Sequence, residues 1–308
     1  MRITKSLEGQ YEIVYASTHP RCAKMVETSQ FYLMPDFSRQ DAWRILPSFF
    51  RLLRILRRER PDAVLTTGAA PGLICIFAAW ILRVKTIWVD STANAIQLSA
   101  SGRIATRFAS RVYTQWPDLA QGDILYAGNV WGIAPQPPKG GFTTPPLGGR
   151  GAGIFVVTGT QLPFDRLIKI LDEIAPELHE EIVAQVNGSQ YLPRHVNTID
   201  ILPPDEFDRL FSQARLIVAH AGIGTIISAM QYQKPIIIFP RIAALGEHRN
   251  EHQLATATKM KEAGWVYVAT DKDELKSLLL ATDLHPLCTI GSGVSESLVK
   301  SLTDFIEQ

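Results

Sequence analysis

The stretch Arg215–Pro240, RLIVAHAGIGTIISAMQYQKPIIIFP, decides the fold of the second half of the chain. Its apolar run Leu216–Ala219 predicts a buried strand, the glycines after it predict a turn, and Thr225–Tyr232 predicts a helix. A second apolar run, Pro235–Phe239, predicts the next strand. Because a strand, a helix and a strand in succession pair in parallel, this segment indicates an α/β sheet with helices on both faces.

The turn after the first of these strands carries groups that suit a phosphate ligand. His220 stands at the carboxyl end of the strand, where α/β proteins bind ligands. Gly222 and Gly224 allow the backbone to approach a ligand closely. Thr225 opens the predicted helix, where it can cap the helix or donate to a phosphate, and the free N–H groups there attract an anion. The pattern also fits an ordinary turn with a buried histidine, but the combination favours phosphate binding.

The strand–helix alternation extends over the whole chain and is interrupted once. Residues 133–153 contain five prolines and six glycines and therefore predict a linker. The sequence predicts two α/β domains, residues 1–132 and residues 154–308. Further strands are expected at residues 11–16, 63–65, 86–89, 111–114, 154–157, 181–186 and 265–268, and helices at 41–59, 72–82, 103–109, 164–174, 205–212, 252–263 and 271–280.

Charge divides the 308 residues in the same way. Residues 1–150 hold 18 Lys and Arg against 10 Asp and Glu, whereas residues 151–308 hold 13 against 20. The two halves are therefore expected to meet different ligands. The three cysteines lack metal or redox spacing and favour a reducing cytoplasm. The longest apolar stretch, Ala69–Leu82, is shorter than the roughly 20 residues that span a bilayer, so a buried helix is expected.

Several motifs of the second half resemble the C-terminal domain of glycosyltransferase family 28. They are HAGIGTI, KPIIIFPR, GEHRNEHQLATATKMKEAG and the opening FVVTGTQLPFDRLI. The similarity is greatest to the donor-binding subunit of the eukaryotic transferase that elongates dolichyl-diphosphate-GlcNAc, and to its bacterial exopolysaccharide counterparts. The resemblance implies that this half binds a UDP-sugar.

The residues that the resemblance assigns to the UDP-sugar are Thr158, Gly159, Thr160, Gln185, His220, Gly222, Gly224, Thr225, Glu247, Asn250, Glu251, His252 and Gln253. His220 and the turn Gly222–Thr225 would hold the diphosphate, and Asn250–Gln253 would reach the ribose or the donor sugar. Asn and Glu at residues 250–251 also suit a solvated helix start, where both side chains act as caps.

The first half resembles the membrane-associated partner subunit of the same transferase, which recruits the lipid-linked acceptor. The similar segments are AVLTTGAAPGL and KTIWVDSTANAIQLSASGRIATRFASRVYTQWPDL. Thr66, Thr67, Gly68 and Arg103 are candidates for the acceptor's diphosphate. The chain thus resembles a fusion of the two subunits and implies a GT-B fold, in which two Rossmann-like domains with parallel sheets face each other across a cleft. The family's first strand and its GGH-like loop have no counterpart before residue 16.

A basic amphipathic segment, residues 39–60, lies in the half that resembles the acceptor subunit. Its arginines accompany Trp43, Phe49, Phe50 and several leucines at helical spacing. Such a helix lies at an anionic membrane surface, or packs on a core and exposes a basic face to water. Peripheral attachment to the inner face of the cytoplasmic membrane is expected.

The expected reaction is metal-independent and inverting, because no DxD pair is placed at a strand end to hold a metal. Asp90 is the first candidate for the base and His19 the second, although both also suit turns. The donor is a UDP-sugar, with GlcNAc and glucuronate both compatible, and the acceptor is a polyprenyl-diphosphate-linked saccharide. No cofactor, metal or nucleic acid is expected, and homo-oligomerisation is left open. The alternatives are a UDP-sugar epimerase of the same fold and a non-catalytic UDP-sugar-binding scaffold.

Overall fold

The computed structural model describes residues 2–26, 29–35, 45–135, 153–248, 252–291 and 293–308, with only the backbone of Ala134, Pro135 and His252. The chain forms two compact units. The first comprises Met1–Gly132 with Gly291–Gln308, and the second comprises Ile133–Ile290. The predicted linker lies mostly in residues 136–152, outside the described part.

The second unit is built on a six-stranded sheet with the order β10-β9-β8-β11-β12-β13, in which all neighbours are parallel. Its strands are β8 (Ile154–Val157), β9 (Ile182–Gln185), β10 (Asn197–Ile199), β11 (Leu216–Ala219), β12 (Ile236–Ile238) and β13 (Tyr267–Val268). The quoted segment supplies the adjacent pair β11 and β12, as the sequence predicts. β8, β11 and β12 are buried along their whole length, which explains why their sequences are continuous apolar runs.

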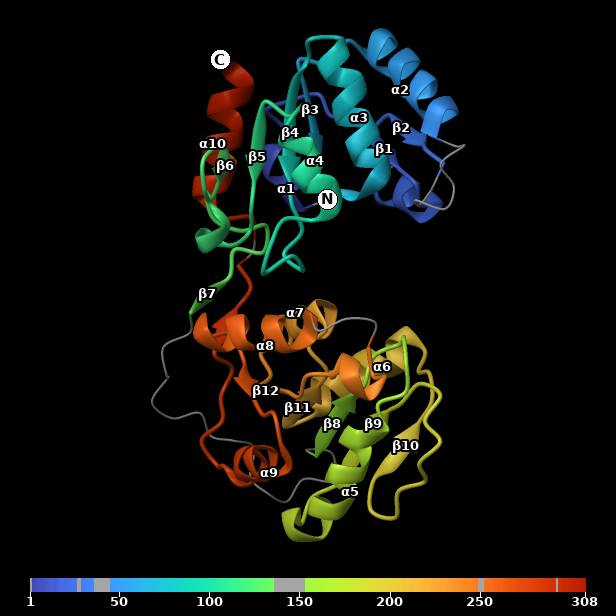
Figure 1. Ribbon diagram of the computed structural model, residues 1–308, viewed down its shortest axis with the longest axis vertical. Helices are drawn as coiled ribbons and strands as arrows, with labels where there is room; N and C mark the ends of the chain where they lie inside the picture. Colours follow the sequence, from blue (N-terminus) through green and yellow to red (C-terminus); the bar gives the residue numbers. More distant parts are fainter. Residues whose placement is uncertain (1, 27–28, 36–44, 136–152, 249–251, 292) are drawn as a thin grey trace. The chain divides into compact units, whose positions relative to one another are not determined.

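Helices cover both faces of this sheet (Figure 1). They are α5 (Asp165–Leu178), α6 (Pro204–Gln213), α7 (Ile223–Gln231), α8 (His252–Glu262) and α9 (Lys272–Leu280). Ile154 and Val156 of β8 belong to the core formed with α5 and α9. Phe155, between them, contacts Phe207 and Phe211 of α6. Alternate strand residues thus bury themselves under different helices. A two-stranded antiparallel ladder joins β7 (Ala134–Pro135) to β14 (Cys288–Thr289).

The first unit contains a four-stranded parallel sheet, β3-β4-β5-β6, and a separate parallel pair, β1-β2. These strands are β1 (Tyr15–Ser17), β2 (Phe31–Leu33), β3 (Ala63–Thr66), β4 (Lys85–Val89), β5 (Arg111–Tyr113) and β6 (Ile124–Leu125). The helices are α1 (Arg2–Leu7), α2 (Ile45–Glu59), α3 (Ala69–Ile81), α4 (Ala100–Ala105) and α10 (Glu296–Glu307). On β4, Trp88 packs in a core with α3 and α4, whereas Ile87 and Val89 face α1 and α10.

The C-terminal helix α10 corrects the expected domain range 154–308. α10 belongs to the first unit, where Leu298 and Leu302 share a core with Ile87. The Tyr113 hydroxyl lies 2.8 Å from the Ser301 hydroxyl, and Lys85 donates to the carbonyl of Ile306 at 2.9 Å. Figure 1 shows α10 beside β5 and β6, although more than half of the chain separates them in sequence. The amphipathic pattern of residues 296–307 indicates a helix but does not indicate which unit's core the helix covers.

Within the described ranges, no helix has both the length and the apolar character needed to cross a bilayer.

A buried carboxylate shapes the loop that follows β9. Asp172 of α5 is 6% exposed and accepts hydrogen bonds from the backbone N–H groups of Arg194 and His195 and from the Tyr191 hydroxyl. Burial raises the pKa of this carboxyl, but these hydrogen bonds outweigh burial and hold the pKa below its ordinary value. Asp172 therefore ties the β9–β10 loop to helix α5.

We expect Asp172→Asn to lower the free energy of unfolding at neutral pH by about 1–3 kcal/mol, because two N–H groups lose a charged acceptor. The folded-state pKa is lowered, so the carboxylate stabilises the fold above about pH 4 and loses this effect as pH falls through the folded-state pKa. Urea unfolding of wild type and variant should therefore converge in acid. Asp200→Asn, at an exposed position, is the control; an equal loss in both variants would contradict the assignment.

Candidate functional site

The strongest candidate site lies at the carboxyl edge of the second unit's sheet, where β8, β11 and β12 end side by side. His220 follows β11 directly, and its backbone N–H donates to the carbonyl of Val157, the last residue of β8, at 3.2 Å. Gly159 follows β8, and Pro240 and Arg241 follow β12. This is the edge at which parallel α/β sheets bind ligands.

Two glycines frame the His220 imidazole. A Cβ atom at Gly159 would lie 2.7 Å from Cε1 of His220, and a Cβ at Gly222 would lie 2.2 Å from its Nε2. Gly159 also has a φ of +88°, a conformation that side chains with a Cβ rarely adopt. Both positions therefore require glycine because the ring occupies the space, which explains part of the glycine pattern seen in the sequence.

The imidazole is held as a neutral ring of defined tautomer. Its Nδ1 lies 3.3 Å from the carbonyl oxygen of Val157, which can only accept, so Nδ1 carries the proton. Burial lowers the pKa of His220 to about 4; the Val157 contact opposes this effect, and the positive charges of Arg241 and His248 add to it. At neutral pH, Nε2 therefore presents a lone pair rather than a proton.

Helix α7 begins beside this ring, two residues earlier than the sequence predicts. Gly222 is its N-cap and supplies no side-chain hydrogen bond. Thr225 is the third helical residue and not the cap, which corrects its predicted capping role. The first N–H groups of a helix have no intrahelical acceptor, and they carry the positive end of the helix dipole. The turn is accessible at Gly224, which is exposed.

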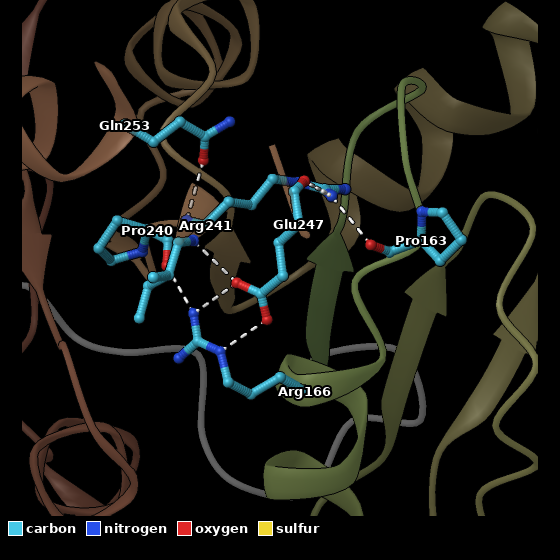
Figure 2. Close-up of polar contacts among 7 residues, drawn as sticks. Pro163, Arg166, Pro240, Arg241, Glu247 and Gln253 are labelled. Atoms are coloured by element: carbon cyan, nitrogen blue, oxygen red, sulfur yellow. Dashed lines mark hydrogen bonds and ion pairs between the residues drawn. The ribbon is translucent and has the colours of Figure 1, made fainter. Parts of the chain in front are cut away.

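A buried guanidinium lies under the same edge (Figure 2). Arg241 is 2% exposed and donates only to backbone carbonyls in the contacts that the structure describes. Its Nη2 reaches the carbonyls of Thr158 and Leu162 at 2.6 Å each, and its Nη1 reaches those of Pro163 and Glu247 at 3.0 and 2.8 Å. The guanidinium thus joins the β8–α5 loop to the segment after β12.

Glu247, a predicted UDP-sugar contact, makes internal contacts in this structure. Its carboxylate accepts from Nε and Nη2 of Arg166 at 2.7 and 2.9 Å and from the backbone N–H of Ile242 at 2.8 Å (Figure 2). Arg166 also donates to the carbonyl of Pro240 and lies 4.6 Å over the ring of Phe239. Glu247 holds the loop after β12 against helix α5.

Gln253 is likewise structural in the described contacts. Its Oε1 accepts from the backbone N–H groups of Ala221 and Arg241 at 3.2 and 3.1 Å, so one amide bridges the segments after β11 and β12. The predicted ligands Asn250 and Glu251 lie outside the described residues, as does the side chain of His252, whose backbone begins α8.

The remaining predicted donor residues lie at this edge but differ in accessibility. Thr158 is buried, and its hydroxyl donates to the carbonyl of Gln185 at 3.1 Å, so this hydroxyl is not accessible at the surface of the edge. Thr160 is exposed and Gln185 is half-buried at the end of β9. The structure therefore brings His220, Gly159, Gly222, Gly224 and Thr160 to one edge.

In the first unit, Asp90 follows β4 as expected but is 3% exposed. Its carboxylate accepts from the backbone N–H and the hydroxyl of Ser99, both at 2.8 Å, and from Nε1 of Trp88 at 3.3 Å. Ser99 in turn caps helix α4. Asp90 therefore anchors the loop before α4, and its burial argues against the predicted role as a base.

The other candidates of the first unit lie at strand ends. Thr66, Thr67 and Gly68 join β3 to α3, where Gly68 is the N-cap and Thr67 is exposed. Arg103 is exposed on α4 and donates to Oε1 of Gln97 at 2.8 Å. His19 is exposed after β1, and its Nδ1 accepts from the backbone N–H of Arg21 at 3.2 Å.

Sequence reasoning missed Arg241 and Arg166. For Arg241, the available signal was a charged residue two positions after the apolar run Ile236–Phe239, at the edge where the ligand was expected. Among the described residues, no group of three or more His, Cys, Asp or Glu side chains is arranged to hold a metal ion.

Comparison with known proteins finds a family match in the second unit. Residues 153–288 match the family model "Glycosyltransferase family 28 C-terminal domain". A UDP-N-acetylglucosamine--N-acetylmuramyl-(pentapeptide) pyrophosphoryl-undecaprenol N-acetylglucosamine transferase of Alkalilimnicola ehrlichii is 27% identical over 264 residues, 79% of this chain and 69% of that protein. Three relatives of the same name, from Anaeromyxobacter, are 24% identical, and the chain spans 63–65% of their lengths.

A further relative resembles part of the chain. The UDP-N-acetylglucosamine transferase subunit ALG14 of Yarrowia lipolytica is 31% identical over 80 residues, which cover 24% of this chain and 37% of that protein. The sequence motifs of the first half predict a resemblance to a subunit of the eukaryotic transferase. They do not predict the match to bacterial pyrophosphoryl-undecaprenol N-acetylglucosamine transferases.

Solved structures show the fold. MurG of Acinetobacter baumannii superposes with a TM-score of 0.63 at 17% identity, covering 99% of this chain and 94% of that one. A UDP-GlcNAc 2-epimerase of Methanocaldococcus jannaschii gives 0.62 at 14% identity, covering 98% and 95%. The chain has a GT-B-like α/β fold with parallel sheets, as predicted, and its residues 153–288 match the glycosyltransferase family 28 C-terminal domain.

Proposed function

We propose that the chain is an inverting, metal-independent glycosyltransferase that moves GlcNAc from UDP-GlcNAc to a polyprenyl-diphosphate-linked saccharide. The carrying observation is the edge of the second sheet, where the uncapped start of α7, two glycines and His220 converge within a family 28 domain. GlcNAc is preferred over glucuronate because the relatives from Alkalilimnicola and Yarrowia are both named for UDP-N-acetylglucosamine. Polysaccharide biosynthesis is the proposed setting.

The departing UDP needs stabilisation as its negative charge develops. The N–H groups at the start of α7 supply it at every pH, because they are fixed by the fold and cost no reorganisation. His220 supplies a hydrogen bond to an oxyanion only after Nε2 gains a proton, since the neutral ring already uses its Nδ1 proton on Val157. Binding of a diphosphate at this ring therefore draws a proton onto it.

The acceptor half supplies the base and the lipid-facing groups in this proposal. With Asp90 buried, His19 is the candidate that the geometry favours, because its imidazole is exposed at a strand end. The base takes the proton of the acceptor hydroxyl as that oxygen bonds to the anomeric carbon and UDP leaves. Thr67 and the N–H groups at Gly68 are proposed contacts of the acceptor's diphosphate, with Arg103 as the nearby cation.

Peripheral membrane attachment is part of the proposal and rests on one surface of the first unit. Helices α2 and α3 pack side by side (Figure 1), and Leu46, Phe50, Trp80 and Ile81 remain exposed on them. A chain of ring contacts runs from Phe49 through Phe77 to Trp80. The exposed arginines Arg51, Arg54, Arg57 and Arg58 accompany these side chains on α2. We call these exposed residues the apolar–basic face; such a surface suits anionic lipid.

A UDP-GlcNAc 2-epimerase is the second candidate, since solved epimerases share the fold. The observation against it is the apolar–basic face, for which an enzyme acting on a soluble nucleotide sugar has no need. An epimerase would convert UDP-GlcNAc without an acceptor.

Incubation of the protein with labelled UDP-GlcNAc and membranes that contain lipid-linked saccharides tests the function. We expect label in the lipid fraction and UDP as the other product, with no epimer formed in the absence of membranes. His19→Gln should abolish transfer and leave UDP-GlcNAc affinity unchanged, because this variant removes the base and not the donor site. Epimer formation without lipid would establish the alternative, and binding without either product would indicate a scaffold.

Donor affinity should depend on pH through His220. The free ring has a pKa of about 4, and a bound diphosphate raises it, so affinity should increase as pH falls through the bound-state pKa toward 4, by at most about tenfold for each pH unit. UDP-GlcNAc is the suitable ligand because it lacks the terminal phosphate that titrates near pH 6.

His220→Gln should flatten this dependence, because an amide donates without titrating. His179→Gln, an exposed position after α5 at the opposite edge of the sheet, is the matched control. Titration calorimetry over this pH range measures both affinity and proton uptake. A flat profile in the wild type would contradict a role of Nε2 at the diphosphate.

The apolar–basic face should bind vesicles. We expect sedimentation with phosphatidylglycerol vesicles and weaker sedimentation with phosphatidylcholine, because each arginine near an anionic surface contributes about 1 kcal/mol. The double variant Phe50→Ser, Trp80→Ser should lower binding at least about tenfold. Leu192→Ser, at an 86% exposed leucine of the second unit, should leave it unchanged. Equal binding of both variants would exclude this face as the lipid contact.

A further inference from the structure

Arg241 carries a buried charge that its direct contacts leave without a carboxylate partner. Its four described acceptors are backbone carbonyls, and the nearby carboxylate of Glu247 is bound by Arg166 instead. Two guanidinium groups thus share one carboxylate, which leaves a net positive charge under the carboxyl edge of the sheet. Burial lowers the pKa of Arg241 to about 10, and Glu247 opposes this effect, so the charge persists at neutral pH. Holding an ion in this environment costs free energy of folding.

The same side chain fixes the geometry around His220. Nη2 holds the carbonyl of Thr158, the residue before Gly159, and Gly159 lies directly against the His220 ring. The backbone N–H of Arg241 shares the Gln253 Oε1 with Ala221, the residue after His220. Both chain segments that border the imidazole are therefore tied to Arg241, which itself is buried beneath them.

The need to fill space explains why the Arg241 side chain packs on the Phe164 ring, but it does not explain why this side chain is charged. A neutral side chain that fills the same space would avoid the desolvation cost. The positive end of helix α7 and the buried guanidinium both favour an anion at this edge, and each is fixed before a ligand arrives. An anionic ligand would neutralise the excess charge.

We propose that Arg241 is a positioning residue of the nucleotide site: it holds the loop Thr158–Pro163 against His220 and supplies the fixed positive charge that a nucleoside diphosphate neutralises. This inference rests on the proposed function, because it assigns Arg241 to the same donor site. It predicts that Arg241 matters for the charged part of the ligand and not for the nucleoside.

Calorimetry with UDP and with uridine, the uncharged probe, separates the two contributions. Arg241→Gln should weaken UDP binding at least about tenfold and uridine binding by less than about twofold, because only UDP carries the charge. Arg241→Lys should fall between the wild type and Arg241→Gln for UDP, since it keeps the charge and loses the planar fork. Arg215→Gln is the matched control: Arg215 pairs with Glu180 before β11, at the opposite edge of the sheet, and should change neither ligand.

Hydrogen exchange provides a readout that does not need a ligand. The amides of Gly159–Leu162 should exchange faster in Arg241→Gln and Arg241→Lys than in wild type, and at the wild-type rate in Arg215→Gln. If Arg241→Gln does not fold, Arg241→Lys carries both measurements.

Wild-type UDP affinity in a folded Arg241→Gln protein would overturn the proposal. An equal loss of UDP and uridine binding would also overturn it, because that result would show general damage to the unit. If wild-type protein binds no UDP, the proposed function fails and the nucleotide role of Arg241 with it. The exchange rates would then decide separately whether Arg241 holds the loop.

Discussion

The buried guanidinium of Arg241 is the constraint on which the second unit's functional edge depends. Hydrogen bonds to a charged donor contribute about 1.5–3 kcal/mol each, and carbonyls left buried without a donor cost a similar amount. The β8–α5 loop and the segment after β12 must therefore come together as the sheet forms. The glycines at residues 159 and 222 then make room for the imidazole between them. Arg241 therefore contributes to the packing, the hydrogen bonding and the electrostatics of this edge.

The two units use their polar residues differently. In the second unit, Glu247, Gln253 and Thr158 satisfy buried groups, and the helix start of α7 is left open. In the first unit, Asp90 and Ser99 satisfy each other and cap α4. What stays exposed there is an apolar and basic helix surface together with Thr67 and His19. One unit thus gathers its candidate anion-binding groups at one sheet edge, and the other exposes a broad helix surface with dispersed polar groups.

The sequence predicted what depends on local pattern. The apolar runs of β8, β11 and β12 and the amphipathic helices follow directly from residue spacing, and so does the place of His220 at a strand end. Glu247 and Gln253 show what local pattern does not predict. The sequence does not distinguish a polar side chain that faces a ligand from one that accepts from a buried backbone N–H. Arg241 escaped prediction because its partners are carbonyls of residues about 80 positions away. The burial of Asp90 and its contact with Ser99 could not be predicted, because they depend on how the loop before α4 folds back on β4.

Helix α10 belongs to the first unit although it follows the second unit in sequence. The backbone leaves the first unit after Gly132 and re-enters it at Gly291, so the first unit is discontinuous in sequence. A fragment that ends between the two halves would lack α10. Ile87 and Val89 would then lose their contacts with this helix, and an apolar face of the sheet would be exposed to water. The second unit, by contrast, is one continuous insertion between two segments of the first. Residues 133–290 could therefore be exchanged as one cassette without breaking the first unit, provided that both junctions are kept.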